Sequence, residues 1–526
     1  MDKTGWAGSI AAVFLWTGAL ACGGTDTPLE ASVIGDAPAL SFHTSQAEIE
    51  SGQLDLDAII ARGKRLFTTS FNTLDGAGRP ETTDVGDANT RPRREFPDNF
   101  NRISGPDANA CAACHHLPRL GGGGDNALNT FTDADRLPFV TFDGMEGDGF
   151  MAQTLKSVGN ERNPVGFFGL GLVELLAREM TVELQGIVDE ASQEAQRVGV
   201  PVSKELVAKG VRFGRITARP NGTVDTSEVD GVDDDFIIKP IQAKGHIVSL
   251  REFAVKAMNS HFGMQATERF GSDADGDGVV DEVTPGDITA LVIFMATMPP
   301  PGRVMPSNPD AIAAVEKGEE LFSGIGCAVC HIPELPLANP VFNEPGPFNP
   351  AGKLQISDVS RLFSVDLTTE GPQPRLRRQT DGTVMVPAFT DLKRHDMGEL
   401  LDNETVVQYG IPSEQWMTRK LWNFASEPPY LHHGRATLIS EAILAHGGEA
   451  QTARDAFSTL PKADQDAVVE FLKTLQVLPE NSTALTVTAG EVEKDAGTGT
   501  VVLGAAIAVF LLAAAAGAVM LGTRRR

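Results

Sequence analysis

Four of the five cysteines in this chain lie in two C-x-x-C-H pentapeptides, residues 111–115 and 327–331. Two thiols at this spacing can add to the two vinyl groups of one haem, and the histidine that follows can then ligate the iron. Structural zinc is the alternative, and it would require further cysteines or histidines at set offsets. Two copies of the motif favour two covalently bound haem c groups. The attachment residues are then Cys111, Cys114, Cys327 and Cys330, and the proximal ligands are His115 and His331.

The chain repeats the frame that would position each pentapeptide. Residues 63–67 (GKRLF) precede the first motif, and residues 318–322 (GEELF) precede the second. Each half then ends in a run whose apolar residues recur at three- and four-residue steps, residues 287–298 and 464–475, as in a helix that buries one face. Prolines follow both runs and are typical helix stops. An opening helix, a C-x-x-C-H turn and a closing helix form the cytochrome c arrangement.

This repeat predicts a mainly α fold with two cytochrome c-like haem domains, residues 46–300 and 301–480. The first domain carries long, loop-rich insertions, because about 43 residues separate Phe67 from Cys111 and a second insertion follows the pentapeptide. Within the insertions, the glycines at 121–124 indicate a tight turn or a surface loop, and a helix is expected around residues 182–198.

Both ends of the chain point to export and a membrane. Residues 1–22 resemble a signal peptide, and Cys22 keeps a lipoprotein signal open as an alternative. Residues 501–523 predict one C-terminal transmembrane helix, and the arginines at 524–526 would then stay cytoplasmic. The body would be exported, periplasmic or extracytoplasmic, and membrane-anchored; a processed sorting tail is the alternative. Residues 23–45 and 481–500 are predicted linkers.

Length and charge limit the partners. The 526 residues leave room for two or three domains, and the formal net charge is -26. No basic stretch offers a phosphate footprint, which excludes nucleic acid as an expected partner. The acidic balance fits either a well-solvated surface or electrostatic attraction of a basic electron-donor protein.

Four segments carry a family resemblance over roughly residues 55–480. They are residues 101–111 (NRISGPDANAC), 169–174 (GLGLVE), 395–398 (HDMG) and 429–438 (PYLHHGRATL). The sequence resembles the bacterial di-haem cytochrome c peroxidase superfamily, and within it the di-haem oxidoreductase branch, which is also labelled thiol oxidoreductase. The chain has no additional pair of redox cysteines, so the thiol activity is set aside.

The resemblance guides the search for the sixth ligand of each haem. A residue about one helix beyond the PYLHHG segment ligates the C-terminal haem in the peroxidases, which implies His446 here, with Met397 as the alternative. For the first haem the candidates are His261 and Met264, with His246 as a third. For each of these residues the alternative is an ordinary core or surface residue that does not ligate iron.

Peroxide chemistry needs an acid–base group beside an open iron position. The resemblance implies a distal glutamate, and Glu174 is the candidate catalytic residue. Arg419 and Arg435 are candidates for pairing with haem propionates, with surface charge as the alternative. Relatives place a tryptophan between the haems, usually from the first domain; Trp422 could substitute here, and core packing around the haem is the alternative.

A separate motif suggests calcium. Residues 273–281 place carboxylates at alternate positions around a glycine, as in the first nine positions of an EF-hand loop, although Thr284 replaces the final glutamate. A solvated acidic loop is the alternative. The candidate ligands are Asp273, Asp275, Asp277 and Asp281.

The sequence therefore predicts a di-haem c-type oxidoreductase of the peroxidase type. Electrons would enter at the C-terminal haem, from a small donor protein or a quinol-linked donor, and peroxide or a related small molecule would be reduced at the N-terminal haem. A non-catalytic electron-transfer cytochrome is the alternative, and oxidation of a partner protein's side chains is a third hypothesis.

Overall fold

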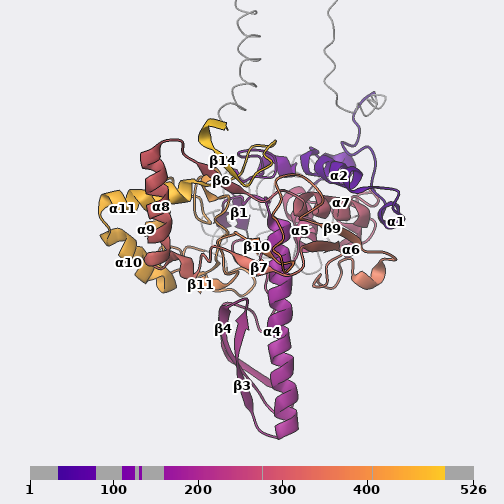
Figure 1. Ribbon diagram of the computed structural model, residues 1–526. Helices are drawn as coiled ribbons and strands as arrows, with labels where there is room; N and C mark the ends of the chain where they lie inside the picture. Colours follow the sequence, from indigo (N-terminus) through magenta and orange to yellow (C-terminus); the bar gives the residue numbers. More distant parts are fainter. Residues whose placement is uncertain are drawn as a thin grey trace, which may run out of the picture. The chain divides into compact units, whose positions relative to one another are not determined.

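The structure, a computed structural model, describes residues 34–78, 109–124, 129–132, 159–274, 276–404 and 407–491. From Pro38 onward the described residues belong to one unit. Two pairs of crossed helices and several small sheets make up this unit (Figure 1).

The first helix pair is α2 (Leu56–Thr68) and α7 (Pro285–Ala296). The side chain of Asp55 caps α2, and a capping box with proline in the first turn starts α7. Both caps accept backbone N–H groups that have no partner within the first turn of the helix. The helices cross at Gly63, where a Cβ would lie 2.0 Å from the carbonyl oxygen of Ala290. Only glycine permits this approach.

The second pair repeats the first. It consists of α8 (Pro309–Gly324) and α11 (Lys462–Lys473), and the cap of α8 is Asn308. A Cβ at Gly318 would lie 1.9 Å from the carbonyl oxygen of Ala467, so the crossing is again made at a glycine. Figure 1 shows the two pairs as separate groups, with small strands between them. The predicted duplication of the opening and closing helices is therefore present in the structure.

A long helix and a three-stranded sheet form the main insertion. Helix α4 (Leu170–Val198) ends at Gly199, whose φ of 74° is left-handed. Strands β3 (Val202–Ala208), β4 (Val211–Ala218) and β5 (Val224–Val229) follow as an antiparallel sheet. Figure 1 shows β3 and β4 alongside the second half of α4.

The remaining elements are short. The helices are α1 (Gln46–Glu50), α5 (Leu250–Phe262), α6 (Thr267–Phe270), α9 (Ile439–Leu444) and α10 (Gln451–Thr459). The paired strands are β1 (Asn129–Thr132) with β2 (Gly159–Arg162), β7 (Leu335–Leu337) with β10 (Val384–Val386), β8 (Val341–Glu344) with β9 (Phe363–Asp366), and β11 (Arg394–Asp396) with β12 (Gln415–Met417). Strand β6 (Gly302–Met305) lies between β13 (Leu475–Gln476) and β14 (Thr486–Thr488).

Two clusters of buried apolar side chains form the core. The larger contains residues from α2, α4, α5 and α7 together with residues from β7, β8 and β10. The smaller lies around α8 and α11 and includes Phe322, Phe389 and Phe471. The larger cluster thus draws on sequence from both sides of residue 300.

The predicted fold class is wrong. Six small sheets among the described residues make this an α-plus-β structure rather than a mainly α one. The sequence pattern did not show the strands because most have only two to four residues.

The predicted membrane-anchored location is also contradicted: none of the helices in the described ranges is long and apolar enough to cross a membrane. The predicted signal (1–22) and transmembrane (501–523) segments lie outside the described residues. Residues 486–488 of one predicted linker form β14, paired in parallel with β6.

Candidate haem sites

The first pentapeptide forms a tight turn after α2. Residues Cys111–Ala113 make the 3-10 helix η4, and none of the four motif cysteines, all within the described ranges, forms a disulfide bond. Imidazole Nδ1 of His115 lies 3.2 Å from the carbonyl oxygen of Gly122, which leaves Nε2 available as a ligand atom. A Cβ at Gly124 would lie 2.3 Å from the carbonyl oxygen of Cys114. The glycine run therefore packs against the motif and orients its histidine.

A cavity opens beside this turn. It contains about 530 Å³ of space between atoms, including space open to solvent, and His115, Cys111 and Cys114 line one side of it. Helix α5 contributes Phe253, Met258 and His261, and the rest of the lining is mostly apolar. A mostly apolar cavity lined by His115 and His261 is suited to an apolar macrocycle that carries a metal ion.

The second pentapeptide is built in the same way. Residues Cys327–Val329 form η6, and Nδ1 of His331 lies 3.1 Å from the carbonyl oxygen of Phe389. The imidazole of His446 faces it, with ring centroids 6.4 Å apart. Nδ1 of His446 lies 2.7 Å from the carbonyl oxygen of Ala442, so this ring too has Nε2 available.

The distance between these two rings fits a shared metal ion. Two imidazoles that ligate one ion from opposite sides, through nitrogen bonds of about 2 Å, have ring centres roughly 6 Å apart. At the first site, the paired thiols, the available Nε2 of His115 and the apolar cavity also fit a haem. The residues present therefore fit two haem groups, one at each pentapeptide.

The electrostatics keep the ligand groups neutral. Burial lowers the pKa of His115 and of His331 to about 4, and burial also lowers the pKa of His446. Burial raises the pKa of Cys111 to about 12 and that of Cys327 to about 11. Neutral imidazole is the form that ligates a metal ion.

The predicted catalytic residue lies elsewhere. Glu174 is buried in α4, where its Oε1 accepts hydrogen bonds from Arg178 at 2.6 and 3.1 Å. Its Oε2 accepts the backbone N–H of Leu250 at 2.8 Å, at the start of α5. These bonds join α4 to α5. Glu174 does not line the first cavity, and its catalytic role stays a prediction.

The two candidate propionate partners are already paired. Arg419 donates to Glu427 at 2.7 Å, and that carboxylate is buried and also accepts from Asn423 at 2.6 Å. Arg435 is more exposed and pairs with Glu161 at 2.6 Å. Their role toward haem stays a prediction.

Of the candidate sixth ligands for the first haem, the structure brings only His261 to the cavity. Met264 is fully buried in the core and does not line the cavity, and His246 stacks on Tyr409 with centroids 4.1 Å apart. Met258, which the sequence analysis did not single out, does line it.

At the second site, Met397 contributes its backbone. Its carbonyl oxygen accepts the N–H of Gly447 at 3.0 Å, directly after His446. The structure thus places His446 opposite His331 and uses Met397 to hold the segment that follows it.

Trp422 lies between the two halves of the chain. Its side chain is 1% exposed and belongs to the larger core cluster. A Cβ at Gly169, at the start of α4, would lie 2.2 Å from its ring. Trp422 is thus a buried aromatic contributed by the second half and packed against the first; its place between the haems stays a prediction.

The calcium loop is only partly described, because Asp275 lies outside the described residues. Asp281 accepts a hydrogen bond from Ser272 at 2.6 Å, and Asp277 accepts the N–H of Val279 at 2.7 Å. Among the described residues, the carboxylates of this loop do not converge into a cluster of metal ligands. Calcium stays a prediction.

The sequence analysis missed the groups that support the ligands. These include the carbonyls of Gly122 and Phe389, and the carboxylates of Asp391 and Glu449, both of which contact His395. The glycine run and the HDMG segment were visible signals. The hydrogen bonds that these segments make were not visible, because the most distant of them, between His395 and Glu449, joins residues 54 positions apart along the chain.

Comparison with known proteins supports the sequence resemblance. Residues 364–475 match the family described as "Di-haem oxidoreductase, putative peroxidase", which confirms the predicted resemblance for that segment. No curated protein matches the chain. A solved structure of hydrazine synthase from Kuenenia stuttgartiensis is similar at 13% identity and a TM-score of 0.32, covering 86% of this chain and 100% of that chain. A likeness at this TM-score carries no argument about fold or function.

Proposed function

We propose that this chain is a di-haem c-type oxidoreductase of the peroxidase type. Each pentapeptide would hold one covalently attached haem c. Electrons would enter at the second haem, and peroxide or a related small acceptor would be reduced at the first. The match of residues 364–475 to di-haem oxidoreductases supports the general class.

One observation carries the assignment of roles: a second imidazole stands close to the proximal histidine at the second site, whereas a cavity lies beside the proximal histidine at the first. At the second site the His446 ring stands 6.4 Å from that of His331, as expected for an iron with both axial positions filled. At the first site a cavity lies beside His115. An iron with both axial positions occupied would suit electron transfer, whereas an iron with an open axial position would suit substrate binding.

The side chains of each site have defined tasks in this proposal. A bound haem supplies the one-electron chemistry. Gly122 and Phe389 accept the Nδ1 protons of His115 and His331, which fixes the ring orientation and leaves Nε2 for iron. Phe253 and the other apolar residues of the first cavity limit the access of water. Trp422 supplies a buried aromatic between the halves.

The alternative, a non-catalytic electron-transfer cytochrome, rests on His261. This residue lines the first cavity together with His115. If His261 ligates the first iron, both haems have filled axial positions and neither binds peroxide.

The test is a spectroscopic one on the haem-loaded protein, produced in a host with a c-type maturation system. A pyridine haemochrome assay should give two covalent haems per chain, and a Cys327→Ser/Cys330→Ser variant should give one. EPR and visible spectra of the oxidised and half-reduced protein should then show one low-spin iron and one that responds to peroxide. Two low-spin irons that ignore peroxide in both redox states would leave the electron-transfer alternative, and His261→Ala would then identify the ligand.

A further inference from the structure

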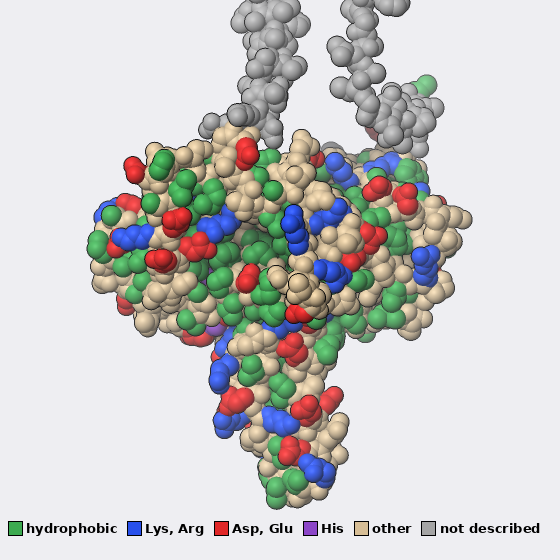
Figure 2. All heavy atoms as spheres, viewed as in Figure 1, with side chains coloured by type: hydrophobic (Ala, Val, Ile, Leu, Met, Phe, Trp, Pro, Cys, Tyr) green, Lys and Arg blue, Asp and Glu red, His purple; other side chains and the backbone are tan. Residues whose placement is uncertain are grey.

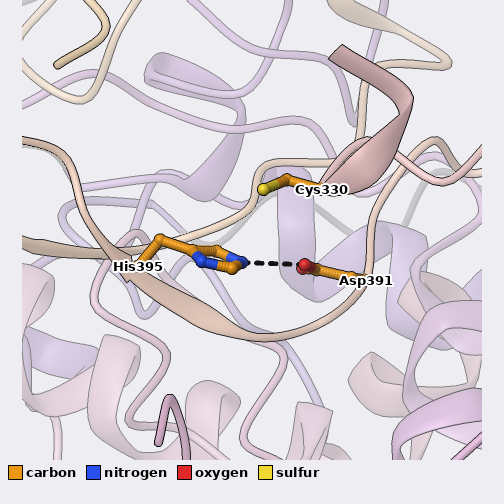
Figure 3. A group of neighbouring side chains, drawn as sticks. All are labelled: Cys330, Asp391 and His395. Carbon is orange, nitrogen blue, oxygen red and sulfur yellow. Dashed lines mark hydrogen bonds and ion pairs between the residues drawn. The ribbon is translucent and has the colours of Figure 1, made fainter. Parts of the chain in front are cut away.

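The HDMG segment at residues 395–398 contacts both sides of the second site. His395, in β11, is buried, and each of its ring nitrogens faces a carboxylate. Nε2 lies 2.8 Å from Asp391 Oδ2, as Figure 3 shows, and Nδ1 lies 2.7 Å from Glu449 Oε2. Burial alone would lower its pKa, but the hydrogen bonds with Asp391, Cys330 and Glu449 raise the pKa of His395 to about 12.

One of these carboxylates belongs to the segment that follows His446. The Oε1 atom of Glu449 accepts the N–H of Asp396 at 2.9 Å, and the N–H of Gly447 donates to the carbonyl of Met397 at 3.0 Å. The two segments approach so closely that a Cβ at Gly448 would lie 2.2 Å from the carbonyl oxygen of Asp396. Residues 447–449 are thus bonded to the HDMG segment at three points.

The other carboxylate belongs to the segment that orients His331. Asp391 follows Phe389 by two residues, and the carbonyl of Phe389 accepts from His331. The N–H of Thr390 also donates to the carbonyl of Ile332 at 3.1 Å. Residues 389–391 are therefore bonded to the residues that carry and follow the proximal ligand.

We infer that His395 is a positioning residue that holds His331 and His446 at the separation required by the second haem iron. Its two ring nitrogens join Asp391 on the His331 side to Glu449 on the His446 side. The inference rests on the proposed function, since it requires a haem between those two rings. Axial ligands that the protein already holds in position before the iron binds lose less conformational entropy on binding. They are also displaced less easily by an added ligand.

The same residues suggest a rival explanation. The ligand atoms of Cys330, Asp391 and His395 all lie within 4.8 Å of one another, which would also suit a divalent metal ion such as zinc (Figure 3). The haem assignment excludes this use, because the Cys330 sulfur is then a thioether and not a thiolate. Metal analysis of the haem-loaded protein separates the two: one zinc per chain, lost in Asp391→Ala, would overturn the inference.

The experiment compares axial ligation in five variants of the haem-loaded protein. His446→Ala identifies the low-spin EPR signal and the CO-binding phase of the second haem. His395→Gln and Glu449→Ala should then weaken the same ligation, so that the affinity of the reduced second haem for CO rises roughly 10- to 100-fold. Glu449→Gln keeps the hydrogen-bonding shape and should retain most of the low-spin signal. Asp455→Ala removes an exposed carboxylate of α10 and should change nothing.

Each outcome bears on a definite claim. Two covalent haems with unchanged CO affinity and low-spin signal in both His395→Gln and Glu449→Ala would overturn the positioning role and leave the proposed function standing. A low-spin signal that survives His446→Ala would overturn the ligand assignment and the positioning role together. Fewer than two covalent haems in the unmodified chain would overturn the proposed function itself.

Discussion

At the scale of single residues, the ligand opposite His331 sets the redox behaviour of the second site. Replacing His446 with Met exchanges an imidazole for a thioether, and a Met/His pair raises the reduction potential of a haem. We expect His446→Met to raise the potential of the second haem by on the order of 0.1 V, within the roughly 0.8 V that axial ligands span. A spectroelectrochemical titration measures it.

The matched control is Leu444→Met, which places the same side chain at an exposed position of α9. It should leave both potentials unchanged. An unaltered potential in His446→Met would show that the ring facing His331 does not ligate the iron.

Glu174 gives a second prediction, because its carboxylate joins α4 to α5 away from the first cavity. Glu174→Gln removes the charge that pairs with buried Arg178, so the free energy of unfolding should fall by about 1–3 kcal/mol. Peroxide turnover per folded molecule should change little. Urea denaturation and steady-state assays measure the two quantities.

Glu194→Gln, at a partly exposed position of the same helix, should lower stability by less than about 0.5 kcal/mol. If Glu174→Gln instead abolishes turnover at unchanged stability, the glutamate acts in catalysis after all.

A pH prediction follows from His43 and Asp287. The hydrogen bond between Nδ1 and the carboxylate, at 2.7 Å, raises the pKa of His43 above its ordinary 6.5. A raised folded-state pKa means that the pair's stabilisation is fully present below pH 6.5 and is lost as the pH rises through the raised value. His43 is 38% exposed, so the effect should stay below about 1 kcal/mol.

Unfolding free energies of the unmodified chain and His43→Gln measure this effect. Their difference should be larger at about pH 6 than at about pH 9. An equal difference at both pH values would exclude an imidazolium at this position.

At the scale of helices, the two crossings at glycine give a paired prediction. Gly63→Ala and Gly318→Ala would each push a Cβ into a facing carbonyl, so each should lower stability by about 1–3 kcal/mol. Gly186→Ala, in α4, meets nothing within 4 Å and should raise stability by up to about 1 kcal/mol, because alanine favours helix more than glycine does. Thermal unfolding monitored by circular dichroism measures all three. A neutral Gly63→Ala would mean that the helices can separate at no cost.

The helices were also the elements that the sequence predicted best. Their apolar periodicity is local, so the closing helices α7 and α11 lie within two residues of the predicted runs. Helix α4 was predicted only from residue 182 onward, because nearly all residues of its first turns are buried and therefore show no single apolar face. Strands such as β7 and β10 pair across some fifty residues, and three residues are too few for a recognisable alternation.

In the candidate sites too, local motifs could be predicted from the sequence and long-range contacts could not. The pentapeptides identify their own cysteines and histidines, and His446 was found by counting along the resembling segment. The supporting bonds were not found, since His395 contacts Glu449 across 54 residues and no local pattern records such a contact.

At the scale of the whole molecule, the net charge of -26 bears on the electron donor. On the face drawn in Figure 2, acidic and basic side chains are interspersed, so the negative charge there is not gathered in one patch. A small basic donor protein should still associate faster at low salt, and its rate of reducing the chain should fall at least about tenfold between low and physiological ionic strength. Stopped-flow kinetics measure it.

An uncharged quinol is the control, and its rate should not depend on salt. A salt-independent rate with the basic protein would favour a quinol-linked donor.

The composition of the larger core has a consequence for synthesis on the ribosome. Leu335, Leu337 and Val384 are among the later residues that complete a core built mainly by the first three hundred residues. When the chain emerges from its N-terminus, helices α2, α4 and α7 are therefore finished well before the strands that cover them. Nascent chains stopped at residue 300 should expose apolar surface and be cut readily by protease, whereas chains that extend past β10 should resist.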